Sequence, residues 1–322
     1  MSSEIRVGGV SFTNYRATVI PAISGLLHWT FYGSMGSSGG VNLAPGGPAN
    51  TQLGSLTVEG TNYITQGTKG SYPTWSTPTL SGGAVVAPSL LTGGSNYYKA
   101  QRMTYSGGGG SGASSVVTIS GGAVTGIGSH TGGSGYVSAP TPNSVPGNTD
   151  CIDTGINRAD LTATGWTMAG VFRCPTSGSP STLFGDAYDS TATGFPMFVT
   201  MQTASGLRAQ MFTSPDITIA LPSSVANWRF IALTVGGTGN KTLNLYSPGD
   251  SLSDTYTYGG GGSVGTTNLR ATFGSVPTAT SNVGTTDMAF SMLTTGVKLE
   301  SEIDTIYAAV KGFLASRSIT VL

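Results

Sequence analysis

The most constraining feature of this sequence is a strict alternation of side chains between residues 166 and 172. One side of the extended chain would carry Trp166, Met168, Gly170 and Phe172, and the other side Thr167, Ala169 and Val171. Period-two alternation with an aromatic residue at each end predicts a half-buried β-strand. Residues 151–156 before it read as a second extended segment, followed by a polar turn at 157–160.

The composition favours strands and tight turns over helices. Glycine supplies 50 of the 322 residues, and only 9% of the chain is charged, against roughly 25% in a typical domain. Glycine, serine and threonine disfavour helix interiors and favour turns. The hydrophobic content of 38% is too high for a disordered chain.

Charge and hydropathy exclude several classes of protein. The 14 basic and 14 acidic residues balance and form no basic block, so we expect no nucleic-acid partner. The apolar stretch near the start contains Pro21 and is too short to cross a bilayer, so we expect no membrane span. The opening MSSEIR has no apolar core, so we expect no secretory signal and synthesis in a cytosol.

Further alternating segments follow the first one at the spacing of an antiparallel all-β sandwich. The predicted strands in residues 146–322 are Trp166–Phe172, Phe195–Met201, Leu207–Phe212, Trp228–Val235, Lys241–Tyr246, Leu269–Phe273 and Met288–Leu293. Earlier in the chain, Gly25–Phe31 reads as a strand with Leu27, Trp29 and Phe31 on one face.

These segments resemble a known family. The "DTGI" strand, its polar turn and the "WTMAGVF" strand look like the opening of a laminin-G or concanavalin A-like jelly roll, and "NWRFIALTV" followed by "LNLY" resembles its paired central strands. The "GLLHWTF" strand is similar to the family's first strand. The resemblance implies one jelly-roll sandwich, whose first part is residues 17–79 and whose main part is residues 146–322.

Residues 80–145 form a different region, rich in glycine and serine, which the resemblance makes an insertion in the sandwich. It contains an internal repeat with a period of 39 residues (120 − 81). Ser81–Val85 recurs as Ser120–Val124, Thr92–Ser95 as Thr131–Ser134, and Tyr97 as Tyr136. Such repeats are supersecondary units that bury their faces against neighbours.

The run "SGGGGSGA…ISGGAVT…GGSGYVSAP" resembles modules of bacteriophage tail-fibre and virion proteins. That resemblance implies a virion location and a homo-oligomer, with a trimer as the expected form. Residues 1–16 are then either a frayed terminus or a segment that attaches the chain to other virion proteins.

One helix is predicted near the end of the chain. Ser301, with Asp304 three residues later, resembles a capping box. An apolar stripe at helical spacing follows, made of Ile303, Ile306, Tyr307, Val310, Phe313 and Leu314. Residues 318–322 are expected to return as a strand.

Catalytic and metal-binding signals are scarce, so we expect no enzyme and no cofactor. The chain has two histidines, His28 in a predicted strand and His130 in a glycine loop, and two cysteines, Cys151 and Cys174. With only these four candidate ligands in the whole chain, we expect no His/Cys zinc site, and we expect the cysteines to be small buried residues. None of the four glutamates lies in an alternating carboxylate strand, which counts against a glycan-cleaving enzyme.

Two groups of residues are candidates for ligand binding. Asp186, Tyr188 and Asp189 lie in the stretch GDAYDS, and family members bind Ca²⁺ or sugar at such loops through aspartate side chains. The alternative is a solvated turn. Tyr256 and Tyr258 would suit sugar stacking, or would simply belong to the core.

The resulting hypothesis is a bacteriophage tail fibre or receptor-binding protein that recognises a host surface glycan or protein. A structural virion component without a ligand is the first alternative, and a glycan-cleaving depolymerase is the second.

Overall fold

The computed structural model describes the chain in segments. They are residues 5–7, 10–12, 22–32, 42–53, 57–59, 63–65, 71–95, 97, 102–144, 151–157, 160–161, 165–174, 180–187, 197–202, 206–211, 217–236, 241–258, 270–274 and 285–322.

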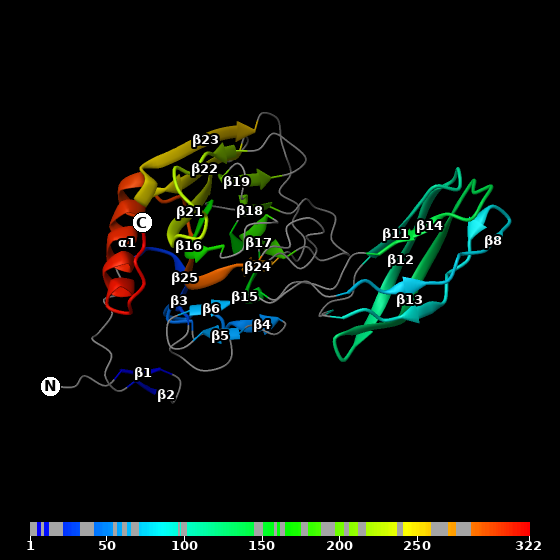
Figure 1. The fold of residues 1–322 in the computed structure, drawn as a ribbon, viewed down its shortest axis with the longest axis horizontal. Helices are drawn as coiled ribbons and strands as arrows, with labels where there is room; N and C mark the ends of the chain where they lie inside the picture. Colours follow the sequence, from blue (N-terminus) through cyan, green and yellow to red (C-terminus); the bar gives the residue numbers. More distant parts are fainter. Residues whose placement is uncertain are drawn as a thin grey trace.

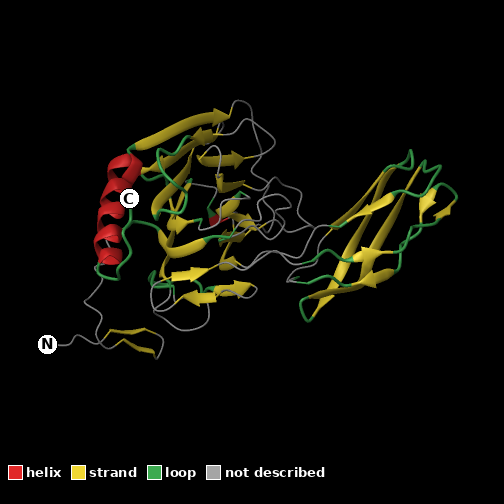
Figure 2. Ribbon diagram, viewed as in Figure 1, coloured by secondary structure: helices red, strands yellow, loops and turns green. Residues whose placement is uncertain are grey.

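The described residues form an all-β fold with a single α-helix among them, as predicted. Figure 1 shows a two-layered sandwich, with helix α1 (Glu300–Ala315) on one side and a narrower β-module at the other end of the long axis. Figure 2 shows how strands dominate both parts. A short hairpin, β1 (Ile5–Val7) and β2 (Val10–Phe12), lies near the N-terminus.

One layer of the sandwich is a seven-stranded antiparallel sheet. Its order is β20 (Ile217–Ile219), β19 (Gly206–Met211), β18 (Met197–Gln202), β17 (Ser181–Ala187), β24 (Arg270–Phe273), β15 (Cys151–Asn157) and β4 (Thr51–Leu53).

The other layer is an eight-stranded antiparallel sheet. Its order is β23 (Leu252–Tyr258), β22 (Lys241–Ser247), β21 (Arg229–Gly236), β16 (Trp166–Arg173), β25 (Asp287–Thr295), β6 (Tyr63–Thr65) and β5 (Thr57–Glu59), and β3 (Leu26–Phe31) also pairs with β25. Strands from before the glycine-rich region therefore pair with strands from after it in both sheets.

Two hydrophobic cores hold the sandwich together. The first fills the space between the sheets and includes Ile152, Phe172, Phe184, Leu233 and Phe273, all fully buried. The second lies on the opposite face of the eight-stranded sheet, where α1 packs through residues such as Ile303 and Leu314. Each large apolar side chain removed from water contributes about 1.5–3 kcal/mol.

Strand β16 differs from its prediction because both of its faces are buried. Met168 and Phe172 belong to the inter-sheet core, while Ala169 and Val171 pack in the core beneath α1. The alternation was predicted correctly, but the helix covers the face that was expected to meet solvent.

Strand β3 also differs from its prediction, because a β-bulge changes its register. His28 pairs with Leu293, and Leu26 pairs with the next residue, Thr294. The extra residue places Leu26, with Trp29 and Phe31, in the core beneath α1, whereas Leu27 packs against the inter-sheet core.

The N-cap of the helix is Leu299, two residues before the predicted Ser301, and Glu302 takes the place in the capping box that was predicted for Asp304. Leu299 N donates a hydrogen bond to Glu302 Oε2 at 2.8 Å. The C-terminal residues do not form a full strand: Val321 makes one parallel bridge to Trp228.

Cys151 and Cys174 are both buried, with no disulfide between them. Burial raises the pKa of the Cys174 thiol to about 11.

The glycine-rich module consists of short strands around one four-stranded antiparallel sheet. The sheet order is β13 (Ala123–Ser134), β12 (Ser111–Ser120), β11 (Arg102–Ser106) and β14 (Thr141–Asn143). β7 (Thr74–Trp75) pairs with β10 (Leu90–Thr92), and β8 (Leu80–Ser81) pairs with β9 (Ala84–Val85). His130 lies in β13 and not in a glycine loop, because β13 continues through Gly132 and Gly133.

Candidate functional site

The structure locates only some of the predicted ligand-binding residues. Asp186 lies in β17 and pairs with Ala271 of β24. Tyr188 and Asp189 lie outside the described residues. Among the residues that the structure describes, no group of three or more His, Cys, Asp or Glu side chains could hold a metal ion. Ca²⁺ binding at this loop therefore stays a prediction.

Tyr256 lies on the inner face of edge strand β23. It stands opposite Leu243, half-buried, and packs against the inter-sheet core. Tyr258 ends the same strand, opposite Lys241. The core alternative stated for Tyr256 fits this placement better than sugar stacking does. Trp166 and Trp228 are buried in the two cores.

The outer face of the eight-stranded sheet carries a row of polar residues that crosses five strands. The strand register aligns Thr294 with Thr167, Thr167 with Thr234, Thr234 with Asn244, and Asn244 with Thr255. We call these five residues the polar row. It lies on the same face as α1, since Ala169 and Ala232, two residues from Thr167 and Thr234, pack beneath the helix.

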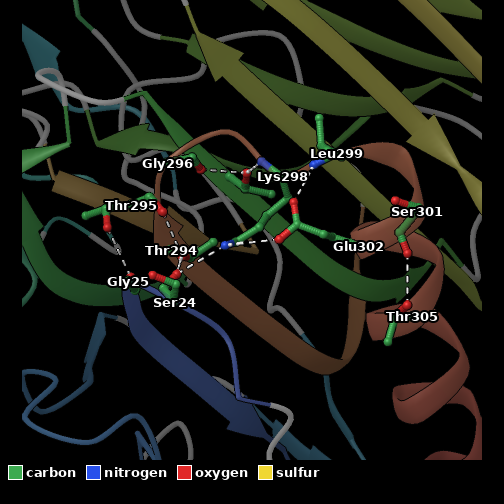
Figure 3. Close-up of polar contacts among 11 residues, drawn as sticks. Ser24, Gly25, Thr294, Thr295, Gly296, Lys298, Leu299, Ser301, Glu302 and Thr305 are labelled. Atoms are coloured by element: carbon green, nitrogen blue, oxygen red, sulfur yellow. Dashed lines mark hydrogen bonds and ion pairs between the residues drawn. The ribbon is translucent and has the colours of Figure 1, made fainter.

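At its buried end, the polar row fixes the connection between β25 and α1 (Figure 3). Thr167 Oγ1 donates to the carbonyl of Gly296 and accepts a hydrogen bond from Lys298 N, both at 3.0 Å. Thr294 Oγ1 donates to the carbonyl of Ser24 at 2.9 Å. The bonds of Thr167 join strand β16 to the loop before the helix, and the bond of Thr294 joins strand β25 to the segment before β3.

Lys298 completes this junction. Its ammonium group is largely buried, donates to the carbonyl of Ser24 at 3.2 Å and lies 3.6 Å from Glu302 Oε1. Because Lys298 is held by groups of the chain itself, this end of the row serves the fold and not a ligand.

Replacing Thr167 with valine tests the structural end of the row. Valine removes the hydroxyl that bonds both Gly296 and Lys298 and leaves a buried N–H without a partner, so the free energy of unfolding should fall by about 1–3 kcal/mol. The exposed Thr218 on β20 offers a control, since its replacement with valine should change stability by less than about 0.5 kcal/mol. Urea titration of both variants measures the difference, and equal stabilities would contradict the role given to Thr167.

At its open end, the row reaches solvent on β22 and β23. Asn244 Nδ2 donates to Thr234 Oγ1 at 3.0 Å, and Thr255 Oγ1 donates to Asn244 Oδ1 at 2.8 Å. Beside them, the hydroxyl oxygens of Thr242 and Thr257 are hydrogen-bonded to each other at 3.0 Å. We call Thr242, Asn244, Thr255 and Thr257 the outer polar patch.

The outer polar patch has free hydrogen-bonding capacity held in fixed positions. An amide carries two N–H donors and two acceptor lone pairs, and each bond described uses one of them. Asn244 therefore keeps one N–H and one lone pair for a ligand. Because its partners fix both ends of the amide, binding would need little side-chain ordering.

One tyrosine borders the patch. Tyr246 lies two residues from Asn244 on β22 and is half-buried beside the core beneath α1. Burial raises the pKa of its phenol, the negative charge of Glu300 raises it further, and a hydrogen bond to Thr234 opposes both. Tyr246 thus stays neutral, next to an exposed carboxylate on α1.

A second buried polar cluster lies between the sheets and has no access to a substrate. His28 Nε2 is 2.7 Å from Ser291 Oγ, which is 2.6 Å from the Tyr32 hydroxyl. All three residues are fully buried, and His28 stacks on Phe273 at 5.1 Å between ring centroids. Burial lowers the pKa of His28 to about 3, with a hydrogen bond to Asn50 opposing it. The cluster is therefore neutral and belongs to the core.

Sequence reasoning missed the outer polar patch, although a signal was present. In "TLNLY" the polar residues alternate with leucines, and in "DTYTY" the threonines alternate with tyrosines. Each pattern predicts a strand with one polar face, but only the register between strands shows that the two faces adjoin.

Comparisons with known proteins give a distant structural likeness. No family model and no curated protein matches the chain. Among solved structures, the chain is similar to the binding domain of botulinum neurotoxin serotype D, with 7% identity and a TM-score of 0.46, over 88% of this chain and 51% of that one. The receptor-binding domain of the C/D mosaic serotype gives 10% identity and a TM-score of 0.46, over 88% and 51%.

A structure of botulinum neurotoxin type C, whose cell entry is described as dependent on two ganglioside molecules, gives 12% identity and a TM-score of 0.38 over 50% of this chain and 40% of that one. The chain spans about half the length of the first two structures. At TM-scores below 0.5, these likenesses assign neither a family nor a ligand to this chain.

Proposed function

We propose that this chain is a receptor-binding protein of a bacteriophage virion, a tail fibre in the simplest case, and that its sandwich recognises an uncharged glycan on the host surface. The observation that carries the recognition role is the outer polar patch, a pre-positioned set of hydroxyl and amide groups in which Thr255 and Thr257 are exposed and Thr242 and Asn244 are half-buried. The virion location rests on the resemblance of the glycine-rich repeats to tail-fibre modules.

The chemistry of the patch favours a neutral, hydroxyl-rich ligand. Sugars present many donors and acceptors at short spacing, which suits side chains that can act as both. The patch itself carries no charged side chain, and the exposed Glu300 beside Tyr246 disfavours an anionic ligand by like-charge repulsion.

Binding of the fluorescently labelled protein to intact cells of candidate host strains tests this function. Asn244→Ala should lower the affinity about tenfold, because one lost ligand hydrogen bond of about 1.4 kcal/mol corresponds to that factor. Thr218→Ala, an exposed threonine on the opposite sheet, is the matched control and should bind like the unmodified protein.

Host strains that lack their surface polysaccharide identify the ligand class. Saturable binding that disappears in such a strain supports glycan recognition. Saturable binding that persists in it points to a protein receptor. An absence of binding to every susceptible strain by the folded protein would favour the structural virion component instead.

The predicted loop is tested in the same assay. If Asp186 and Asp189 carry the site, their replacement with alanine lowers binding while Asn244→Ala leaves it unchanged. Dependence of binding on added Ca²⁺ would support that loop, whereas the outer polar patch predicts binding that chelators do not affect.

A further inference from the structure

The two 39-residue repeats of the glycine-rich module fold into equivalent hairpins. The tight turns at Gly82-Gly83 and Gly121-Gly122 have nearly identical backbones, with φ values of +59° and +79° in the first and +57° and +78° in the second. Positive φ at both positions is the conformation of a two-residue hairpin turn, which glycine adopts without strain.

Each tyrosine lies in a hydrophobic cluster with the hairpin of the other repeat. Val85 and Leu80 of the first repeat pack with Tyr136 of the second. Conversely, Val124 and Ile119 of the second repeat pack with Tyr97 of the first, in a cluster that Leu90 of the first repeat also joins. Since Tyr97 and Tyr136 are equivalent positions, each repeat supplies the aromatic residue that fills the core of the other.

The backbone contacts connect the two repeats in the same reciprocal way. Tyr136 N donates to the carbonyl of Gly83, and Tyr97 N donates to the carbonyl of Gly122, both at 2.9 Å. These two bonds connect equivalent atoms with the repeats interchanged. Strands β11 and β14, which are also equivalent, pair antiparallel with Thr104 opposite Asn143, its own counterpart 39 residues later. The module therefore has an approximate two-fold axis through this pair.

Two glycines let the repeats approach each other closely enough for this reciprocal packing. A Cβ atom on Gly93 would lie 2.4 Å from the carbonyl oxygen of Val124, and one on Gly132 would lie 2.7 Å from that of Val85. Gly93 belongs to the first repeat and contacts the hairpin of the second. Gly132 belongs to the second repeat and makes the equivalent contact with the hairpin of the first. Neither contact can be relieved by a side-chain rotation, because the obstructing atom is backbone.

We propose that the 39-residue unit is an interlocking element, completed only by a second unit, which can belong to the same chain or to another copy of it. A unit without its partner has an apolar half-core facing solvent and a tyrosine with no cavity to fill. The partner that fits this surface is a second copy of the same unit, because the interface is self-complementary about a two-fold axis.

Removal of one repeat from the otherwise intact chain tests the proposal. Deletion of residues 84–122 joins Gly83 to Ala123 and preserves the Ser-Gly-Gly-Ala-Val turn sequence. The shortened chain keeps one hairpin, Tyr136 and β14, but has no second unit. Sedimentation should then show particles with twice as many chains as those of the intact protein. Hydrogen exchange should show protection of Tyr136 only in those particles.

A shortened chain that does not gain a partner would overturn the proposal, whether or not its module is protected from exchange. Protection without association would mean that a unit completes itself. Loss of protection without association would mean that a second copy cannot complete it.

Point variants of the full chain give an independent test. Tyr97→Ala should raise hydrogen exchange in the second hairpin, around Val117 and Val124, more than in the first, and Tyr136→Ala should do the reverse. A variant that raises hydrogen exchange only in its own repeat would contradict the packing of each tyrosine against the other repeat. Gly93→Ala should loosen the module, whereas Gly126→Ala should not, because the nearest atom to its Cβ would be Thr118 Oγ1 at 3.6 Å.

Discussion

Replacing Asp250 with alanine should lower the free energy of unfolding by about 3–5 kcal/mol, the largest effect we expect from one substitution. The Arg229 side chain is 1% exposed, and its Nε donates to Asp250 Oδ2 at 2.9 Å. Without the carboxylate, a fully buried guanidinium has no counter-charge, and the Ser247 hydroxyl that donates to the same oxygen at 2.7 Å loses its acceptor. Urea unfolding followed by tryptophan fluorescence measures the change.

The ion pair between Arg173 and Asp287 provides the matched control. Its bond length is similar, 2.7 Å, but the Arg173 side chain is 29% exposed. The guanidinium also lies over the rings of Tyr63 and Trp228, at 4.9 and 4.7 Å from their centroids. Because Arg173 can reach water, Asp287→Ala should cost clearly less than Asp250→Ala. Equal losses would show that burial of the arginine does not set the cost.

A second variant separates charge from packing at Arg229. Combining Arg229→Met with Asp250→Ala removes both charges and should recover a large part of the lost stability, since an apolar pair of similar volume can replace a buried ion pair. If the double variant is no more stable than Asp250→Ala alone, the loss comes from packing and not from an unpaired charge.

Acidification should destabilise the sandwich through His28, which is the second large effect. Its pKa of about 3 in the folded protein lies below the unfolded value of 6.5, so the folded state favours the neutral imidazole. This contribution to stability is complete above pH 6.5 and is lost as the pH falls from 6.5 toward 3. By linkage, a fall from pH 7 to 4.5 removes about 2–3 kcal/mol.

Comparison of two histidine variants separates the contribution of His28 to the pH dependence of stability from the contribution of the carboxylates, which also titrate in this range. His28→Phe keeps an aromatic ring against Phe273 and should reduce the stability difference between pH 7 and pH 4.5 by about 2–3 kcal/mol. His130→Gln alters the only other histidine, which lies in the module, and should leave the pH dependence of the sandwich unchanged. A pH dependence that survives in the His28 variant would contradict this account.

Local sequence patterns predicted the elements of the sandwich well, because alternation and turn residues act over a few neighbours. The strand at 166–173 and the apolar stripe of α1 follow directly from periodicity. The burial of both faces of β16 could not be predicted in this way, because it depends on a helix more than a hundred residues later that packs on the sheet.

The candidate site depended even more on long-range register. Thr167, Thr234, Asn244 and Thr255 are ordinary strand residues taken singly, and they form a row only because four strands align them. The residues selected from sequence, Asp186, Tyr188 and Asp189, were chosen because aspartate-rich turns bind ligands in the family that the chain resembles. Tyr256 was chosen as an aromatic, but its position in the alternation places it opposite Leu243 on the inner face.

The repeat was visible in the sequence, but the packing of each tyrosine against the hairpin of the other unit was not. A period of 39 residues shows that two units are alike. It does not show whether Tyr97 packs against its own hairpin or against the other one, since both arrangements use the same residues.

Hydrogen exchange of the intact protein, with and without the purified surface polysaccharide of a susceptible host, tests whether the outer polar patch binds the glycan. Bound polysaccharide should slow exchange in residues 242–246 and 252–257, the strands that carry the outer polar patch, and leave residues 181–187 unchanged. Slowed exchange confined to residues 181–187 would place the binding site at the Asp186 loop and contradict the assignment to the patch.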